Sequence, residues 1–461
     1  MEVEDYRNLV RPHVAGRKVI VTGGPLAALT PTIKLLRSLG AQRPFVLGFG
    51  EGTGELPDRA KTDQLVLDLS APDVVSELRA QDAAMADLPA HARAALDTYD
   101  PRREAVAIVG TPSYAQPDVA GRHNLGPRTP ESLALEDKTI VDELWDAFGV
   151  TRPPTTVVSA EARALDDAAG RLDHGMGTVW SGDATEGFNG GGEFVRWVRA
   201  GDDGAAREAA SFFAAHCRRV RVMPFLAGTP CSIHGMVFRD GVAVFRPVEL
   251  VTLTRPGASR MVYAGTATFY DPPLEARAEM RSAARRVGEG LQARIGFRGA
   301  FTVDGVMTAD GFLPTELNPR SGAGLTPLGA PLPRLPLHLL HLAAREDENL
   351  EARPAELERL VVAAADHSRQ GAAYTFTTVR FTESVTHRVV YDGNACRIAT
   401  DGEQEDATIT VGPSNVGGFV RIAPDPARTP AGPSIVPLAV AGFTLSDREW
   451  ATGIGPVGSK P

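Results

Sequence analysis

Two extended segments at residues 299–320, GAFTVDGVMTADGFLPTELNPR, constrain the fold of this chain most strongly. They flank Ala309-Asp310-Gly311, and Asp-Gly between such segments predicts a β-hairpin. A glycine that ends a three-residue loop suits the left-handed position of a G1 bulge. A turn centred on Asp310 places Asp304 on one strand directly opposite Glu316 on the other.

The same register places four polar side chains on one face, because side chains alternate along a strand. They are Asp304, Glu316, Asn318 and Arg320. Opposed carboxylates repel, so either a raised pKa or a bound divalent cation must offset the repulsion. The oxygens of Asp304, Glu316 and Asn318 suit Mg²⁺, with Mn²⁺ as an alternative, and substrate phosphates usually complete such a shell. The hairpin therefore predicts a nucleotide; the alternative is a solvated hairpin with incidental charges.

Composition indicates a globular protein of two to four domains. The chain has 461 residues, of which 43% are hydrophobic and 23% charged. Its net charge of −9 and lack of a basic block argue against nucleic acid or an anionic membrane as a partner. The first 16 residues are too charged for a signal peptide, and no apolar run approaches bilayer-spanning length. Three widely spaced cysteines favour a reduced, cytoplasmic protein.

The N-terminal part predicts a parallel sheet. Between residues 16 and 110, short apolar runs alternate with helical segments, the pattern of strands joined by right-handed crossovers. Such sheets bind ligands at the carboxyl ends of their strands, where glycines occur at 23–24 and 48–54. Neither run has the spacing G-x-G-x-x-G, so turns are the preferred interpretation over nucleotide contact.

The rest of the chain predicts mixed α/β and α+β structure. A helix is expected from about residue 132 to 148, strands and a glycine-dense loop to 225, and a strand-rich region with one long helix to 320. After a helical stretch, residues 374–461 alternate like antiparallel strands and are expected to form a separate β-rich unit. The expected domains are residues 1–125, 126–225, 226–370 and 371–461.

The hairpin resembles the metal-binding hairpin of the ATP-grasp superfamily. Asp304 is followed twelve residues later by Glu316-Leu317-Asn318-Pro319-Arg320. The resemblance implies an ATP-grasp fold: a preceding parallel α/β domain, a lid subdomain and a core, here with an additional C-terminal β-rich domain. It also implies ATP and Mg²⁺ as cofactors, Asp304, Glu316 and Asn318 as metal ligands, and Arg320 as the catalytic arginine.

Weaker similarities imply further contacts to the nucleotide. Lys138 stands where the superfamily commonly has a lysine that reaches the phosphates. The loop 184–195 resembles the glycine-rich lid loop, although an ordinary surface loop is equally consistent with it. Glu249 is expected near the nucleotide or the substrate. The remaining implied nucleotide contacts are Gly190, Gly191, Gly192, Met223, Phe225 and Leu226.

One position departs from the ATP-grasp pattern. The strand before the lid loop normally carries a second phosphate-binding lysine, but here it reads GTVWSGD, with Trp180 and Ser181 at that place. Arg255 or Arg260 is the expected substitute. Loss of the reaction is the alternative.

The resemblance implies a ligase that joins a carboxylate to an amine through an acyl phosphate and releases ADP. The layout is similar to that of peptide ligases of actinobacterial natural-product pathways, of the pheganomycin type. The expected substrates are an amino-acid-like acid and an amino acid or peptide; a homodimer is common for this architecture, and the sequence leaves the oligomeric state open. Residues 321–325 either leave room for a substrate or form a plain turn. A small-molecule kinase and an inactive nucleotide-binding regulator are the other hypotheses.

Overall fold

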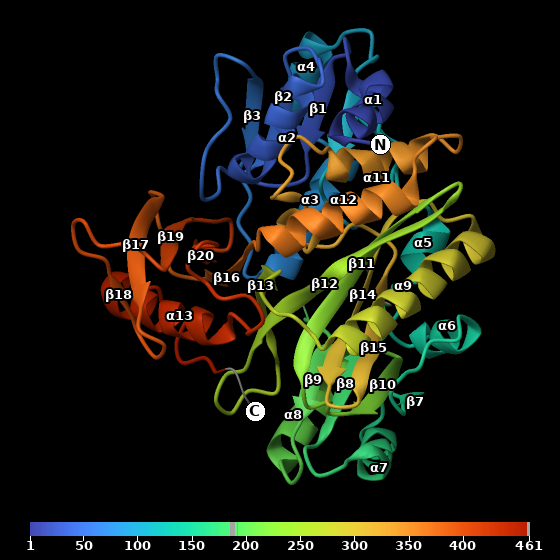
Figure 1. Ribbon diagram of the computed structural model, residues 1–461, viewed down its shortest axis with the longest axis vertical. Helices are drawn as coiled ribbons and strands as arrows, with labels where there is room; N and C mark the ends of the chain where they lie inside the picture. The colour runs from blue at the N-terminus through green and yellow to red at the C-terminus, as the bar shows by residue number, and fades with distance from the viewer. Residues whose placement is uncertain (185–189, 191, 459–461) are drawn as a thin grey trace.

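A computed structural model describes residues 1–184, 190 and 192–458. Its N-terminal part, at the top of Figure 1, is built around a parallel sheet with the strand order β3-β2-β1-β4. The predicted parallel sheet is therefore confirmed. The elements of this part are α1 (Val3–Val14), β1 (Val19–Thr22), α2 (Leu26–Ser38), β2 (Phe45–Phe49), β3 (Asp63–Leu67), α3 (Val74–Ala86), α4 (Ala90–Tyr99), β4 (Val106–Val109), β5 (Asp118–Val119) and β6 (Arg122–His123).

The glycines at the carboxyl ends of these strands form tight turns. Gly23 has a φ of 92°, and a Cβ there would lie 2.5 Å from the backbone nitrogen of Thr111. Gly50 has a φ of 72°, and its carbonyl accepts a hydrogen bond from the Leu26 amide at the start of α2. Both positions require glycine for backbone conformation and close approach.

A second, antiparallel sheet with the order β7-β10-β8-β9 forms the lower part of Figure 1. Helices α7 and α8 bury one of its faces, where Trp180 and Phe213 pack together. The elements that lead to and form this part are α5 (Pro130–Ala134), α6 (Val141–Ala147), β7 (Thr156–Ser159), α7 (Ala162–Leu172), β8 (Thr178–Gly182), β9 (Val195–Val198), α8 (Asp203–His216) and β10 (Arg219–Pro224).

A ten-stranded antiparallel sheet crosses the centre of the molecule, with the order β15-β14-β11-β12-β13-β16-β20-β19-β17-β18. The helices α9, α11 and α12 lie beside its first strands in Figure 1. Its first half and the adjoining helices are β11 (Thr229–Phe238), β12 (Gly241–Leu253), β13 (Val262–Ala267), α9 (Leu274–Ile295), β14 (Gly299–Thr308), β15 (Gly311–Asn318), α10 (Leu325–Gly329), α11 (Leu337–Glu346) and α12 (Pro354–His367).

The C-terminal strands extend this central sheet. Strand β16 pairs with β13 through Gly265–Ala373, Thr266–Ala372 and Ala267–Gly371. The C-terminal region was expected to be a separate β-rich unit, but its strands belong to the same sheet as the core strands. Helix α13 packs on the face of these strands that carries Val420 and Ile422. Its elements are β16 (Gly371–Thr377), β17 (Val385–Tyr391), β18 (Cys396–Ile398), β19 (Ala407–Pro413), β20 (Gly418–Pro424) and α13 (Val436–Trp450).

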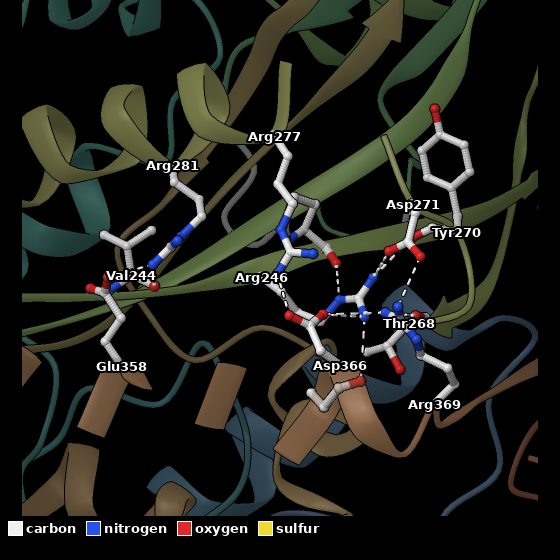
Figure 2. A network of polar contacts seen from close by, with 12 residues as sticks. Val244, Arg246, Thr268, Tyr270, Asp271, Arg277, Arg281, Glu358, Asp366 and Arg369 are labelled. Atoms are coloured by element: carbon white, nitrogen blue, oxygen red, sulfur yellow. Dashed lines mark hydrogen bonds and ion pairs between the residues drawn. The ribbon is translucent and has the colours of Figure 1, made fainter. Parts of the chain in front are cut away.

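A buried ion network joins strand β12 to the helices beside it (Figure 2). Arg246 is fully buried, and its Nη atoms lie 2.6 Å from Asp271 Oδ1 and 2.9 Å from Asp366 Oδ1. Arg277 of α9 lies 2.6 Å from Asp366, and Arg369 lies 2.8 Å from Asp271. Arg246, Arg277 and Arg369 thus share the carboxylates of Asp271 and Asp366. These ion pairs offset the free-energy cost of burying the Arg246 charge.

The β19–β20 turn also contacts the N-terminal domain. Asn415 Nδ2 donates to the Phe49 carbonyl at 3.0 Å and to Glu77 Oε1 at 2.7 Å, and the Ala71 amide donates to the Asn415 carbonyl at 3.1 Å. The C-terminal strands therefore touch the carboxyl edge of the N-terminal sheet. Among the described residues, no helix is both long and apolar enough to cross a membrane.

Candidate active site

The β14–β15 hairpin has the predicted cross-strand pair, although its loop length differs from the prediction and a bulge compensates for the difference. Asp304 pairs with Glu316, as expected. Near the turn, however, Thr308 pairs with Gly311, so the loop has two residues rather than three. The register shifts between Asp304 and Gly305, and Thr315 is the extra residue of the resulting bulge. This bulge restores the expected pairing, and Gly311 has the predicted positive φ, 119°.

The opposed carboxylates lie within a connected polar set. Lys138 Nζ lies 2.9 Å from Glu316 Oε1, and Asn318 Nδ2 donates to Asp304 Oδ2 at 3.0 Å. The other Asp304 oxygen, Oδ1, is buried without a hydrogen-bond partner in the described part of the chain. A buried carboxylate oxygen left without a donor is costly, so a cation or a proton is needed there.

The two carboxyl groups have opposite pKa shifts. Burial, and then the charge of Glu316, raises the pKa of Asp304 to about 7. Burial alone would also raise the pKa of Glu316, but the charges of Lys138 and Arg320 lower it below the usual value. Glu316 is therefore the charged member of the pair, and Asp304 is the member that a cation would ionise.

Arg320 lies next to the carboxylate pair. Its Nη2 donates to Asn318 Oδ1 at 3.0 Å, and its Nε donates to Glu136 Oε1 at 3.0 Å. Arg128 binds the same Glu136 oxygen. The side-chain oxygen Oδ1 of Asn318 has two lone pairs, so it can accept a hydrogen bond from Arg320 and still ligate a cation. These contacts hold the Arg320 guanidinium beside the metal-ligand candidates.

The expected continuous helix from residue 132 to 148 is wrong. Helix α5 ends at Ala134 and α6 begins at Val141, with Lys138 between them. The Asp137 side chain accepts hydrogen bonds from the Thr139 amide at 2.8 Å and hydroxyl at 2.7 Å, a local competitor of helical bonding. The break places Lys138 against Glu316 rather than on an exposed helix face.

A row of polar residues on β11, which the sequence analysis did not single out, continues the site. Ser232 is the cross-strand partner of Asp304, and His234 is that of Thr302. His234 is buried between the Ser232 hydroxyl at 3.1 Å and the Thr302 hydroxyl at 3.0 Å. Burial lowers the pKa of His234 to about 3, so its imidazole is neutral. The sequence did contain a signal for this row: in residues 231–235, CSIHG, the polar residues Ser232 and His234 alternate with apolar ones.

The segment 321–325, for which substrate room and a plain turn were both open, packs on this histidine. A Cβ on Gly324 would lie 2.1 Å from His234 Nε2, and one on Gly322 would lie 2.5 Å from Thr302 Oγ1. Leu325 then begins α10. The small residues are thus required by close packing beside the site.

The lid-loop prediction is only partly within the described residues. Gly191 lies outside them. The Glu193 amide donates to the Gly190 carbonyl at 3.3 Å, and Gly192 has a φ of 75°. Arg260 forms an ion pair with Glu193 at 2.5 Å. Gly192 thus begins a turn that leads into β9, and the role of Gly190 and Gly192 toward a nucleotide stays a prediction.

Met223, Phe225 and Leu226 lie in one apolar cluster with Val179 and Trp197. Trp197 stacks on Phe225 with ring centroids 4.3 Å apart, and Val179 and Met223 are buried beside them. The Phe225 amide donates to the Gly177 carbonyl at 3.0 Å, so this amide is already used within the sheet. The expected contact of these three residues with adenine stays a prediction.

The strand that lacks the second lysine has an arginine as its neighbour. Trp180 faces the helices, with its indole nitrogen 2.8 Å from Thr178 Oγ1, whereas Ser181 faces the other side and pairs with Arg221 on β10. Arg221 binds both oxygens of Asp142, at 2.8 and 2.7 Å.

Neither Arg255 nor Arg260, the two expected substitutes for the lysine, is a cross-strand partner of Trp180 or Ser181. Arg255 donates to the Ile454 carbonyl, and Arg260 binds Glu193. Two arginines are instead cross-strand partners of these positions: Arg221 pairs with Ser181, and Arg196 pairs with Trp180 and lies over the Phe212 ring of α8.

Glu249 was expected near the nucleotide or substrate, but it contacts the start of α13. It is 1% exposed and accepts hydrogen bonds from the Ser434 hydroxyl and, at 3.1 Å, the Ile435 amide. Burial raises its pKa to about 7. On β12 it projects opposite to Val248, the cross-strand partner of Ser232, so it lies on the other side of the sheet from the carboxylate pair.

Comparison with solved structures identifies the fold. The biotin carboxylase domain of Hydrogenobacter thermophilus 2-oxoglutarate carboxylase, determined as a dimer with MgADP, ADP and bicarbonate, has a TM-score of 0.56 at 10% identity, over 89% of this chain and 86% of that one. Thermotoga maritima phosphoribosylamine–glycine ligase has a TM-score of 0.55 at 12% identity, over 93% of this chain and 96% of that one. Campylobacter jejuni biotin carboxylase gives 0.55 at 12% identity, over 88% and 87%.

These similarities show that the chain has the ATP-grasp fold, with a parallel N-terminal sheet and a large antiparallel sheet. The matched proteins are ATP-grasp ligases and carboxylases, and the similarity spans nearly the whole of this chain. The sequence itself matches no protein-family description and no curated protein.

Proposed function

We propose that the protein is an ATP- and Mg²⁺-dependent ligase. It joins the carboxylate of an amino acid or amino-acid-like acid to the amino group of an amino acid or peptide, within natural-product biosynthesis. One observation carries the proposal: within an ATP-grasp fold, Asp304 faces Glu316, and the Asp304 oxygen Oδ1 is buried without a donor in the described residues. Lys138 and Arg320 lie beside this pair, which suits a site for a cation and a polyphosphate.

The residues present fit a divalent cation. Asp304, Glu316 and Asn318 supply only oxygen atoms, and Asp304 Oδ1 needs a positive partner. Bound Mg²⁺ would neutralise phosphate oxygens and orient ATP. Lys138 holds Glu316 in its charged form and adds positive charge for the phosphates.

The reaction then proceeds in two displacements. An oxygen of the acid attacks the γ-phosphorus of ATP, the bond to ADP breaks, and an acyl phosphate forms. The amine attacks the acyl carbon and loses a proton, and phosphate leaves. The Arg320 guanidinium stabilises charge on the phosphoryl group and on the tetrahedral oxyanion, because its donors are held beside the reacting groups.

The substitution Glu316→Gln tests the metal and phosphate role. We expect ADP release in the presence of acid and amine to fall at least about a hundredfold, because the charged ligand is lost. Asp310→Asn, in the exposed turn of the same hairpin, is the matched control and should retain wild-type turnover. A panel of amino acids and short peptides, with products weighed by mass spectrometry, identifies the substrates. Near-normal turnover of Glu316→Gln would refute the site.

Two other functions predict different products. A small-molecule kinase on this fold would give a product that keeps the phosphate, which mass spectrometry detects. An inactive nucleotide-binding regulator would bind ATP without ADP release under any substrate mixture. The metal-ligand set Asp304, Glu316 and Asn318 is intact, which favours an active enzyme over the regulator.

A further inference from the structure

Helix α11 carries three basic side chains along one face: His338, His341 and Arg345. Their spacing of three and then four residues is that of neighbours on a helix surface. In Figure 1, α11 lies between the N-terminal sheet and the central sheet, and its apolar residues share one core with α1 and with Ala300 of β14. The helix therefore connects two parts of the molecule, and the proposed reaction assigns no role to its basic face.

The chain just before α5 packs closely against the end of this helix. The Gly126 amide donates to Glu346 Oε2 at 2.9 Å. A Cβ on Gly126 would lie 2.3 Å from the Leu342 carbonyl oxygen, so only glycine allows this approach. The contact places Arg128, two residues further along the chain, beside the last turns of α11.

Arg128 lies between this helix and the reaction centre. Its Nη1 donates to the Pro112 carbonyl at 2.7 Å, and its Nη2 donates to Glu136 Oε1. The same Glu136 oxygen accepts from Arg320 Nε at 3.0 Å. Two guanidiniums that bind one oxygen atom are immediate neighbours, so Arg128 links the basic face of α11 to Arg320.

Three groups of this cluster lack an acceptor among the residues that the structure describes. Arg128 Nε and His341 Nδ1 are buried without a hydrogen-bond partner. Arg345 forms no ion pair or hydrogen bond there either; its stem lies against Gly299 at the start of β14, where a Cβ would be 2.7 Å from Arg345 Cδ. Donors left without acceptors are costly, so the cluster favours a bound acceptor.

His341 can act as a donor in this cluster. It is 6% exposed, and burial lowers its pKa well below the usual value, so its imidazole is neutral. A neutral imidazole has one N–H, and an acceptor beside Nδ1 favours the tautomer that has the proton on this nitrogen.

Positive charge exceeds negative charge in this cluster. Burial, and then the charge of Arg128, lower the pKa of Arg345 to about 9. The acids that contact the cluster within the described chain are Glu136, shared by two arginines, and Glu346, whose two oxygens are already engaged. Arg345 is half-buried and His338 is exposed, so solvent reaches the cluster. A planar guanidinium with unused donors suits a carboxylate or a phosphate.

We propose that Arg128, His341 and Arg345 form a subsite for a second anionic group of the acid substrate, which is a short diacid or a phosphorylated acid. One carboxylate lies at Arg320, where it is activated. The second anionic group accepts hydrogen bonds from Arg345, His341 Nδ1 and Arg128 Nε. Because Arg128 and Arg320 are neighbours, a short carbon chain spans the two positions. This inference rests on the proposed ligase function and names the class of its acid substrate.

A series of short diacids tests the subsite by titration calorimetry with MgADP present. Succinate, glutarate and adipate are compared with their monoamides, which lack only the second charge, and phosphonoacetate is compared with acetate. We expect the best dianion to bind the wild type at least about tenfold more tightly than its partner with one charge, because charge-assisted hydrogen bonds are lost. Tightest binding of a diacid would identify the second group as a carboxylate, and tightest binding of phosphonoacetate as a phosphate.

Substitutions at Arg345 assign the preference to this subsite. Arg345→Gln should abolish the preference for the second charge, and Arg345→Lys should keep part of it. Arg334→Gln, just before α11 and 73% exposed, is the matched control and should keep all of it. Binding of MgADP, which each variant should retain, shows that the variants are folded.

The outcomes separate this inference from the proposed function. Hydroxylamine attacks the acyl carbon of an acyl phosphate and phosphate leaves, so hydroxamate formation from ATP and an acid reports activation without the amine substrate. If hydroxamate forms but no dianion binds more tightly than its partner, the subsite assignment is wrong. A preference that survives in Arg345→Gln also overturns it. If the dianions are preferred through Arg345 but no acid gives hydroxamate, the subsite stands and the ligase proposal falls.

Discussion

At the scale of single residues, burial and neighbouring charges decide which of the two carboxyl groups in the site is ionised. Asp304 and Glu316 are chemically similar, yet Lys138 keeps Glu316 charged while burial raises the pKa of Asp304. The difference follows mainly from the Lys138 ion pair at 2.9 Å, and the charge of Arg320 acts in the same direction. The pair thus presents one fixed negative charge and one oxygen that a cation can recruit.

Glu249 gives a prediction at this scale. Because burial raises its folded pKa from 4.5 to about 7, its contribution to stability is present below about pH 4.5 and is lost as the pH rises through 7. The free energy of unfolding of the wild type, relative to Glu249→Gln, should therefore fall by on the order of 3 kcal/mol between pH 4.5 and 8. Urea denaturation of both proteins measures this difference.

The exposed Glu348 serves as control. Its replacement by glutamine should change the free energy of unfolding by less than about 0.5 kcal/mol, because the side chain is in water in both states. A difference between wild type and Glu249→Gln that does not change with pH would contradict the buried assignment.

Sequence reasoning found the residues whose spacing is local and missed those that tertiary structure brings in. Asp304, Glu316, Asn318 and Arg320 follow from one hairpin and are found together. His234, by contrast, is 68 residues from Thr302 in the sequence, and only the pairing of β11 with β14 brings it beside the site.

At the scale of elements, local backbone chemistry corrects what periodicity alone predicts. The hairpin turn has two residues and a compensating bulge at Thr315, so the predicted carboxylate pair occurs although the loop length was wrong. The helix through Lys138 is broken by hydrogen bonds to the Asp137 side chain. Bulges and side-chain turns depend on hydrogen bonds that an apolar pattern does not specify.

The ion network around Arg246 gives a prediction for the packing of β12 on α12. Arg246→Met removes the fully buried arginine from Asp271 and Asp366, which are 31% and 33% exposed, so we expect a loss of about 2 kcal/mol in the free energy of unfolding. Arg285→Met is the control: its side chain is 40% exposed and its partner Glu358 keeps Arg281. The control should lose less than about 1 kcal/mol.

Urea denaturation compares the two variants with the wild type. Equal losses for Arg246→Met and Arg285→Met would show that the network in Figure 2 adds nothing beyond a surface ion pair.

At the scale of the whole molecule, the central sheet joins the candidate active site to the C-terminal strands. Its first strands carry the carboxylate pair, and the turn between its strands β19 and β20 contacts the N-terminal domain through Asn415. The pairing of β13 with β16 joins residues about a hundred positions apart, such as Gly265 and Ala373. Sequence alternation predicts each strand but not which distant strand it joins.

In the proposed reaction, the site activates a carboxylate by phosphoryl transfer from ATP. The most direct measurement uses the acid substrate labelled with ¹⁸O in its carboxylate, with mass spectrometry of the released phosphate. We predict ADP as the nucleotide product and one ¹⁸O atom in the phosphate, because the acid oxygen bridges to phosphorus in the acyl phosphate and leaves with it. AMP with pyrophosphate, or phosphate without label, would contradict the account.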